Sequence, residues 1–225
     1  MGPQRNRGRD ERHLARRGPS RERYDRVLIV TEGEKTEPNY FREIQKAFRL
    51  PTANVVVLPS ERGTAPDQVV AAARSLFEHG KSQPPVSARA FDRVYVVFDR
   101  DDHASYAHAI QAAKKLDGKL RNDERQPVPF IAVPSVPCFE VWLLLHFEDV
   151  QPPVDRAGIQ SRLRAHLPDY SKASTDLFER LRARIDDARK RALRPAVPLG
   201  TDEAWTPYTR VHELVDCLMT LRRPS

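Results

Sequence analysis

Residues 94–102 read VYVVFDRDD, a run of five apolar residues followed at once by three acidic residues and one arginine. β-Branched and aromatic side chains fill the apolar run, which is typical of a strand buried on both faces. The strand is expected to stop at Asp99, where the apolar character ends. This stretch therefore predicts a strand of a parallel sheet with an acidic loop at its carboxyl end.

Three further apolar runs, and the patterns between them, extend this prediction. The connecting segments place apolar residues three and four positions apart, which is the spacing of an amphipathic helix. Alternating strands and helices indicate an α/β fold with a mainly parallel sheet and helices on both faces. The other strands are predicted at 27–30, 55–58 and 130–133, and the helices are predicted to begin near Pro38, Pro66 and Ala104.

Beyond residue 136 the strand signals stop and helical patterns take over. Helices are expected over 139–147, 156–166, 175–193 and 209–221, with Pro-rich links at 150–155 and 194–207. The first 25 residues are crowded with Arg, Gly and Pro and are expected to be a disordered tail. The predicted organisation is a tail (1–25), an α/β core (26–136) and a helical C-terminal part (137–225).

The composition narrows the class of protein. The chain has 225 residues, and 38 Lys and Arg against 31 Asp and Glu give a formal net charge of +7. Residues 1–23 hold eight Arg and three acidic residues, so the remainder is nearly balanced. Two Cys without a CxxC spacing favour neither a disulfide scaffold nor a zinc site. No apolar run reaches the roughly 18 to 20 residues of a membrane helix, so we expect a soluble, cytoplasmic protein that does not bind membranes.

Acidic residues follow two of the predicted strands. Glu32 comes after the first strand, and Asp99 and Asp101 come after the third. Strand-to-helix loops of a parallel sheet converge on one crevice, and residues two apart in an extended segment point the same way. Three carboxylates repel one another unless a cation lies between them, and oxygen ligands favour Mg²⁺ or Mn²⁺. Such a site suits phosphoryl transfer or phosphodiester hydrolysis.

Several of these residues also allow a structural interpretation. An acidic loop can be an ordinary solvated turn, and Asp102 fits the N-cap of the helix that follows it. Glu140, at the start of an apolar segment, is either exposed at a helix N-terminus or functional. Lys172 is either a solvated loop residue or a cation for a transition-state phosphate. His146 fits a packing role near a helix end.

Three segments of the chain resemble the RloB-like family. They are LIVTEGEKTEPNYF at 28–41, VVFDRD at 96–101 and PSVPCFEVWLLLHF at 134–147, and their order and spacing match the family pattern. A glutamate after the first strand and a D-x-D after the third also form the signature of the TOPRIM fold. That fold is shared by topoisomerases, primases and nucleases of the overcoming-lysogenization-defect type. The resemblance implies a TOPRIM, Rossmann-like sheet with a helical C-terminal extension.

The resemblance also implies a function and a set of site residues. Glu32 matches the TOPRIM glutamate, a general base or metal ligand, and Asp99 and Asp101 match the D-x-D metal ligands. Glu37 is a second acidic candidate ligand, and Glu140 belongs to the third motif. The implied protein is a Mg²⁺- or Mn²⁺-dependent nuclease of prokaryotic anti-phage defence.

The resemblance further implies a partner, an ABC- or AAA-type ATPase encoded nearby. The alternative is a non-catalytic effector subunit of such an ATPase complex. Lys172 and the Arg-rich 175–193 segment are candidate phosphate contacts in a nucleic acid. DNA and RNA both remain open as substrates, and a homo-oligomer is possible.

Overall fold

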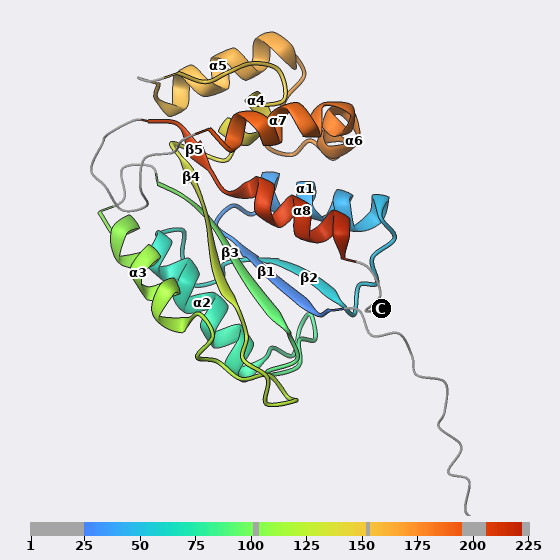
Figure 1. Ribbon diagram of the computed structural model, residues 1–225, viewed down its shortest axis with the longest axis vertical. Helices are drawn as coiled ribbons and strands as arrows, with labels where there is room; N and C mark the ends of the chain where they lie inside the picture. Colours follow the sequence, from blue (N-terminus) through green and yellow to red (C-terminus); the bar gives the residue numbers. More distant parts are fainter. Residues whose placement is uncertain (1–24, 101–103, 152–153, 195–205, 222–225) are drawn as a thin grey trace, which may run out of the picture.

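The computed structural model describes residues 25–100, 104–151, 154–194 and 206–221. Five strands form one sheet in the order β2-β1-β3-β4-β5, which confirms the predicted α/β class (Figure 1). The first four strands pair in parallel, and β5 joins β4 in the antiparallel sense. The strands are β1 (Val27–Thr31), β2 (Val55–Pro59), β3 (Arg93–Asp99), β4 (Phe130–Val136) and β5 (Tyr208–Thr209).

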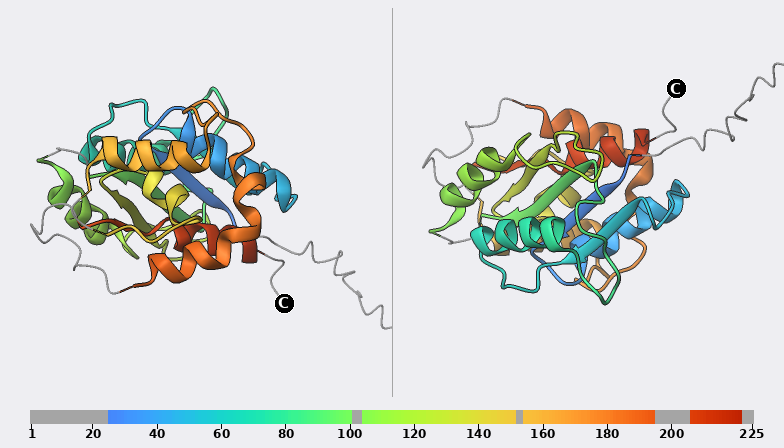
Figure 2. Two further views of the ribbon diagram at one scale, coloured as in Figure 1. Left: turned by 90° about the horizontal axis from the view of Figure 1, so that it is seen from above. Right: turned by 90° about the horizontal axis from the view of Figure 1, so that it is seen from below.

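Helices cover both faces of the sheet (Figures 1 and 2). α1 (Thr36–Ala47) and α8 (Val211–Thr220) lie on one face, and α2 (Pro66–His79) and α3 (Tyr106–Leu116) lie on the other. Successive side chains of β1 point to opposite faces of the sheet, and all of them are buried. Both faces of this strand are therefore apolar. This double burial explains why the strands are unbroken apolar runs.

The edge strand β2 is closed on its open side by two side chains of α1. Gln45 Nε2 donates to the carbonyl of Val55 at 2.9 Å, and an Arg42 guanidinium nitrogen donates to the carbonyl of Val57 at 3.0 Å. Both carbonyls thereby gain partners that the sheet itself does not supply at its edge. Gln45 is buried, so its hydrogen bond is protected from water.

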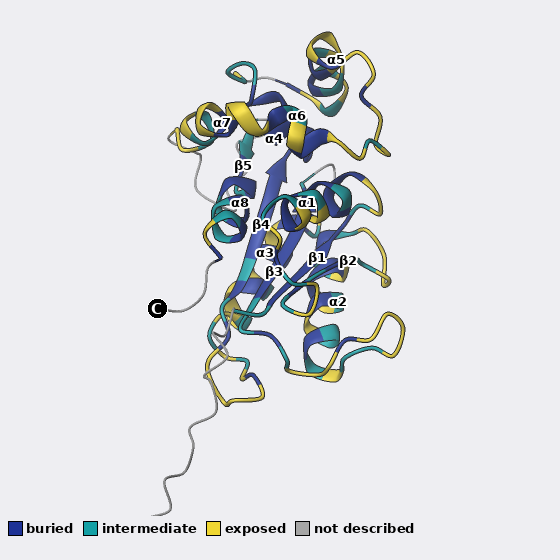
Figure 3. Cartoon of the chain, turned by 90° about the vertical axis from the view of Figure 1, so that its right-hand side faces the viewer, coloured by how far each residue is buried: buried dark blue, intermediate teal, exposed yellow. Residues whose placement is uncertain are grey.

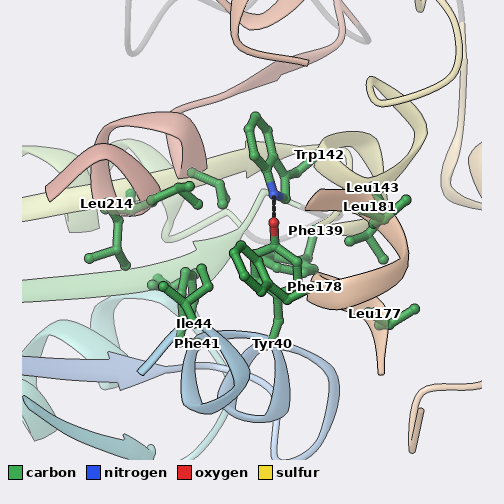
Figure 4. Close-up of a cluster of buried hydrophobic side chains, with 14 of the residues drawn as sticks. Tyr40, Phe41, Ile44, Phe139, Trp142, Leu143, Leu177, Phe178, Leu181 and Leu214 are labelled. Carbon is green, nitrogen blue, oxygen red and sulfur yellow. Dashed lines mark hydrogen bonds between the residues drawn. The ribbon is translucent and has the colours of Figure 1, made fainter. Parts of the chain in front are cut away.

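The group of helices between β4 and β5 lies beyond the carboxyl ends of the strands (Figure 1). It shares one hydrophobic cluster with the α1 face of the sheet. Trp142 of α4 donates its indole N–H to the hydroxyl of Tyr40 in α1 at 2.9 Å, inside this cluster (Figure 4). The outer faces of these helices are exposed, whereas β1 is buried along its whole length and the edge strand β2 is only partly buried (Figure 3). The elements are α4 (Glu140–Leu144), α5 (Arg156–His166), α6 (Leu177–Leu181), a 3-10 turn η1 (Arg182–Arg184) and α7 (Ile185–Ala192).

Three of the expected helices differ from those observed. The expected helix over 175–193 is divided into α6, η1 and α7, because the chain tightens into a 3-10 turn over three residues that bury no side chain. The expected helix over 139–147 is helical only at Glu140–Leu144. Thr209 does not begin the last helix. It lies in β5, where its hydroxyl is 2.9 Å from that of Ser135.

The predicted disordered tail and the N-cap role of Asp102 concern residues outside the described ranges. Within those ranges, no helix is both long and apolar enough to cross a membrane.

Candidate active site

The carboxyl ends of β1 and β3 lie side by side at the point where the strand order reverses. From β1 the chain turns through α1 to β2 on one side, while β3 and β4 lie on the other. Sheets of this kind leave a crevice outside the strand ends at the reversal point. Glu32 directly follows β1, and Asp99 is the last residue of β3. Glu32 and Asp99 therefore lie at the same edge of the sheet, as predicted from the sequence.

A cleft of about 260 Å³ opens at this position. Acidic residues from three separate parts of the chain line it, together with basic side chains. Of the residues predicted from sequence, Asp101 lies outside the described ranges. The others line the cleft: Glu32, Glu37, Asp99, Glu140 and Lys172.

Glu32 ties the end of β1 to the end of β3. Its backbone N–H donates to the carbonyl of Val97 at 2.9 Å, which continues the parallel pairing by one residue. Its carboxylate Oε2 accepts a hydrogen bond from the backbone N–H of Asp99 at 2.8 Å. Glu32 is 8 % exposed, so this contact is shielded from water. The first acid is consequently held in a fixed position beside the second.

The two carboxylate oxygens of Asp99 differ in their contacts. Its Oδ2 accepts from an Arg156 guanidinium nitrogen at 2.8 Å. Its Oδ1 is buried and has no hydrogen-bond partner among the described residues. Burial raises the pKa of Asp99 well above its usual value, the nearby Glu37 raises it further, and Arg156 opposes the shift. A buried acceptor without a partner is costly and calls for a donor or a cation.

Glu37 lies in the first turn of α1 and is buried. Burial raises the pKa of its carboxyl to about 7, and the charges of Glu140 and Glu32 act in the same direction. A Cβ on Gly33 would overlap the Glu37 carboxylate. Gly33 therefore lets the carboxylate fold back against the loop, and a larger residue would displace the Glu37 side chain. The sequence suggested only a tight turn here.

Glu140 begins α4 and is 4 % exposed, which excludes the exposed helix-end alternative. Its Oε1 accepts hydrogen bonds from Gln160 Nε2 and from the Tyr170 hydroxyl, both at 3.1 Å. These two donors orient the carboxylate on the wall of the cleft. Glu140 is thus buried, and both of these hydrogen-bond donors are neutral groups.

The basic residues differ in how they reach the cleft. Lys172 is exposed at the rim, and its carbonyl accepts from the Thr36 hydroxyl at 3.1 Å, which ties its loop to the start of α1. Arg156 was missed by the sequence reasoning, because its neighbour Asp99 is 57 residues away. The only local signal was its place as the first residue of a helix capped by Asp155, whose Oδ1 accepts from the N–H of Gly158 at 2.7 Å.

Two other sequence features have structural roles. His146 is buried, with Nδ1 2.9 Å from the Trp142 carbonyl and its ring edge-on to the indole, and burial lowers its pKa to about 4. The Arg-rich segment is partly neutralised by ion pairs such as Arg180 with Asp169 and Arg189 with Asp216. The packing interpretation of His146 is confirmed, and the basic face is weaker than its composition indicates.

The donor set of the cleft fits a hard divalent cation. Four buried carboxylates line one cleft, and one of their oxygens has no hydrogen-bond partner among the described residues. Oxygen ligands are those that Mg²⁺ and Mn²⁺ prefer. Among the described residues, no three His, Cys, Asp or Glu side chains are already arranged as a complete ligand group.

The fold and the cleft define the molecule as an α/β protein with a buried acidic site at the reversal point of a mainly parallel sheet. Comparison with known families gives a narrower assignment. The chain belongs to the RloB-like protein family, whose model matches residues 27–218. No curated protein and no solved structure matches the chain significantly.

Proposed function

We propose that this protein is a metal-dependent nuclease of the TOPRIM type that hydrolyses phosphodiester bonds in a nucleic acid. The observation that carries the proposal is the meeting of four buried acids in one cleft, where Asp99 Oδ1 has no hydrogen-bond partner among the described residues. Mg²⁺ or Mn²⁺ would be held by the predicted ligands Glu32, Glu37, Asp99, Asp101 and Glu140.

The residues of the cleft would have different roles in the hydrolysis. A bound divalent cation supplies an activated water and stabilises charge on the leaving oxygen. Glu32, fixed by the N–H of Asp99, is placed to orient or deprotonate the attacking water. Lys172 and Lys35, both exposed at the rim, are placed to bind the substrate phosphate.

The size of the cleft is compatible with a phosphodiester group. Its volume of about 260 Å³ leaves room for that group and its ions, with the rest of a polymeric substrate outside. Membership of the RloB-like family supports a nucleic acid as the substrate. From the resemblance we also propose a cytoplasmic role in anti-phage defence beside an ABC- or AAA-type ATPase.

A second candidate is a non-catalytic effector subunit of an ATPase complex. One observation favours it: Arg156 supplies a counter-charge to Asp99 from the chain itself. Such an ion pair is also compatible with a structural role for Asp99 in a binding protein. The two candidates differ in whether the acidic residues are needed for bond cleavage.

The deciding experiment is a cleavage assay on plasmid DNA and on total cellular RNA. Wild type, Asp99→Asn and the control Asp186→Asn are compared in Mg²⁺, Mn²⁺ and EDTA, with and without the neighbouring ATPase and ATP. Asp186 is a suitable control because its side chain is 82 % exposed. Metal-dependent cleavage that is lost only in Asp99→Asn supports the nuclease. If neither substrate is cleaved under any of these conditions, the nuclease proposal is rejected in favour of the effector subunit.

A further inference from the structure

One face of helix α5 supplies donors to two different acids of the cleft. Arg156 and Gln160 are four residues apart and therefore lie on the same side of the helix. Arg156 reaches Asp99 at the end of β3, and Gln160 reaches Glu140 at the start of α4. Helix α5 thus presents a cation and an amide to carboxylates that come from separate elements.

The backbone of α5 is anchored, whereas the side chain of Arg156 is partly exposed. Ile159 and Leu163 are fully buried in the hydrophobic cluster that also contains α4. The side chain of Arg156 is 36 % exposed, and that of Asp99 is 8 % exposed. The guanidinium can therefore change partner without any displacement of the helix. The ion pair that it gives up is partly exposed to solvent, so its loss costs little free energy.

We infer that Arg156 is a built-in counter-ion of the metal-free cleft, which leaves Asp99 when a divalent cation binds and then contacts the substrate phosphate. This inference rests on the proposed function. Arg156 holds one oxygen of Asp99, and the other oxygen of this carboxylate has no partner in the described part of the chain. A metal ion at that carboxylate and the guanidinium repel each other, so the two compete.

The chemistry of the guanidinium explains where it goes after release. Its planar fork of N–H donors matches the geometry of a phosphate, which it can bind with two parallel hydrogen bonds. Arg156 lines the same cleft as Lys35 and Lys172, so a phosphate bound there lies within its reach. Arg156 is consequently a substrate-binding residue whose release from Asp99 couples metal loading to substrate binding.

The first test is the affinity of the full chain for Mn²⁺, measured by isothermal titration calorimetry. Arg156→Gln removes the competing charge and is expected to bind Mn²⁺ about threefold to tenfold more tightly than wild type. Arg156→Lys keeps a charge and is expected to stay nearer to wild type. The control Arg162→Gln removes a guanidinium from the same helix that pairs with Glu148 instead, and its affinity should not change.

Each outcome of the titration has a definite meaning. Equal or weaker Mn²⁺ binding by folded Arg156→Gln overturns this inference and leaves the proposed function intact. No Mn²⁺ binding by wild type overturns both. A circular dichroism melt of each variant shows that it is folded.

The second test measures the binding of fluorescent DNA and RNA oligonucleotides by fluorescence anisotropy. A gel run after each titration shows whether the oligonucleotide is still intact. With Mn²⁺ present, Arg156→Gln is expected to bind the preferred probe several-fold more weakly than wild type, and Arg162→Gln is expected to bind it equally. In EDTA the loss should be smaller, because Arg156 is then engaged with Asp99. An equal loss in Mn²⁺ and in EDTA, or none in either, contradicts the exchange of partners.

Discussion

Replacing Glu37 with Gln should change how the stability of the metal-free protein depends on pH. The pKa of Glu37 is raised from 4.5 to about 7, chiefly by burial. The folded protein therefore keeps a proton that the unfolded chain loses between these values. A raised carboxyl pKa contributes stability at low pH, and that contribution is lost as the pH rises through about 7. Glu37→Gln removes this dependence because an amide does not titrate.

The size of the effect follows from the shift. Each unit of pKa difference is worth about 1.4 kcal/mol, so the full shift of Glu37 corresponds to about 3 kcal/mol. Between pH 5 and pH 7 the expected loss of stability from this group is about 2 kcal/mol. His146 acts in the opposite sense, since burial lowers its pKa from 6.5 to about 4 and its contribution is lost as the pH falls. The two residues largely offset each other in wild type.

The assay is urea unfolding in EDTA at pH 5 and pH 7, for wild type, Glu37→Gln and the exposed control Glu34→Gln. The free energy of unfolding of Glu37→Gln, relative to wild type, should be about 2 kcal/mol higher at pH 7 than at pH 5. Glu34→Gln should follow wild type at both values. The same difference from wild type at pH 5 and pH 7 would show that the Glu37 carboxyl is not held protonated by its burial.

Three further predictions concern the metal, the loop and the core. Mn²⁺ should raise the melting temperature of wild type more at pH 7 than at pH 5, because protons compete for the carboxylates, and EDTA should reverse it. Scanning fluorimetry checks this, and equal shifts count against a carboxylate site. Gly33→Ala should displace the Glu37 carboxylate and weaken Mn²⁺ binding in calorimetry, with little change in melting temperature. Unaltered affinity would exclude Glu37 as a ligand. Tyr40→Phe should cost about 1–3 kcal/mol in urea unfolding, because Trp142 Nε1 loses its buried acceptor. A free energy unchanged from wild type would show that this hydrogen bond contributes no net stability.

The sheet and the acidic edge could be predicted because their signals are local in sequence. Each strand is a continuous apolar run, and Glu32 and Asp99 directly follow the runs that place them. The parallel arrangement then brings the two acids together without further information. Glu37 and Glu140, in contrast, were identified through the family motifs, and the structure adds that both are buried in the same cleft.

Other features depend on contacts between distant segments. Arg156 reaches Asp99 only because α5 packs against α4, and no pattern around residue 156 indicates this. The interruption of the 175–193 helix was hidden for a different reason. Its buried residues keep helical spacing through the 3-10 turn, so the periodicity is the same whether the helix is continuous or broken: Leu177, Phe178, Leu181, Ile185 and Ala188.

The contacts from Gln45 and Arg42 to the carbonyls of β2 bear on how this protein can meet other proteins. An open strand edge invites a strand from another molecule, and this is a common route to sheet growth and aggregation. Here the two acceptors that such a strand would need are already taken by α1. Association through β2 is therefore disfavoured. We expect the proposed partners, a second copy or an ATPase, to bind surfaces other than this strand edge, so that their binding does not require strand exchange.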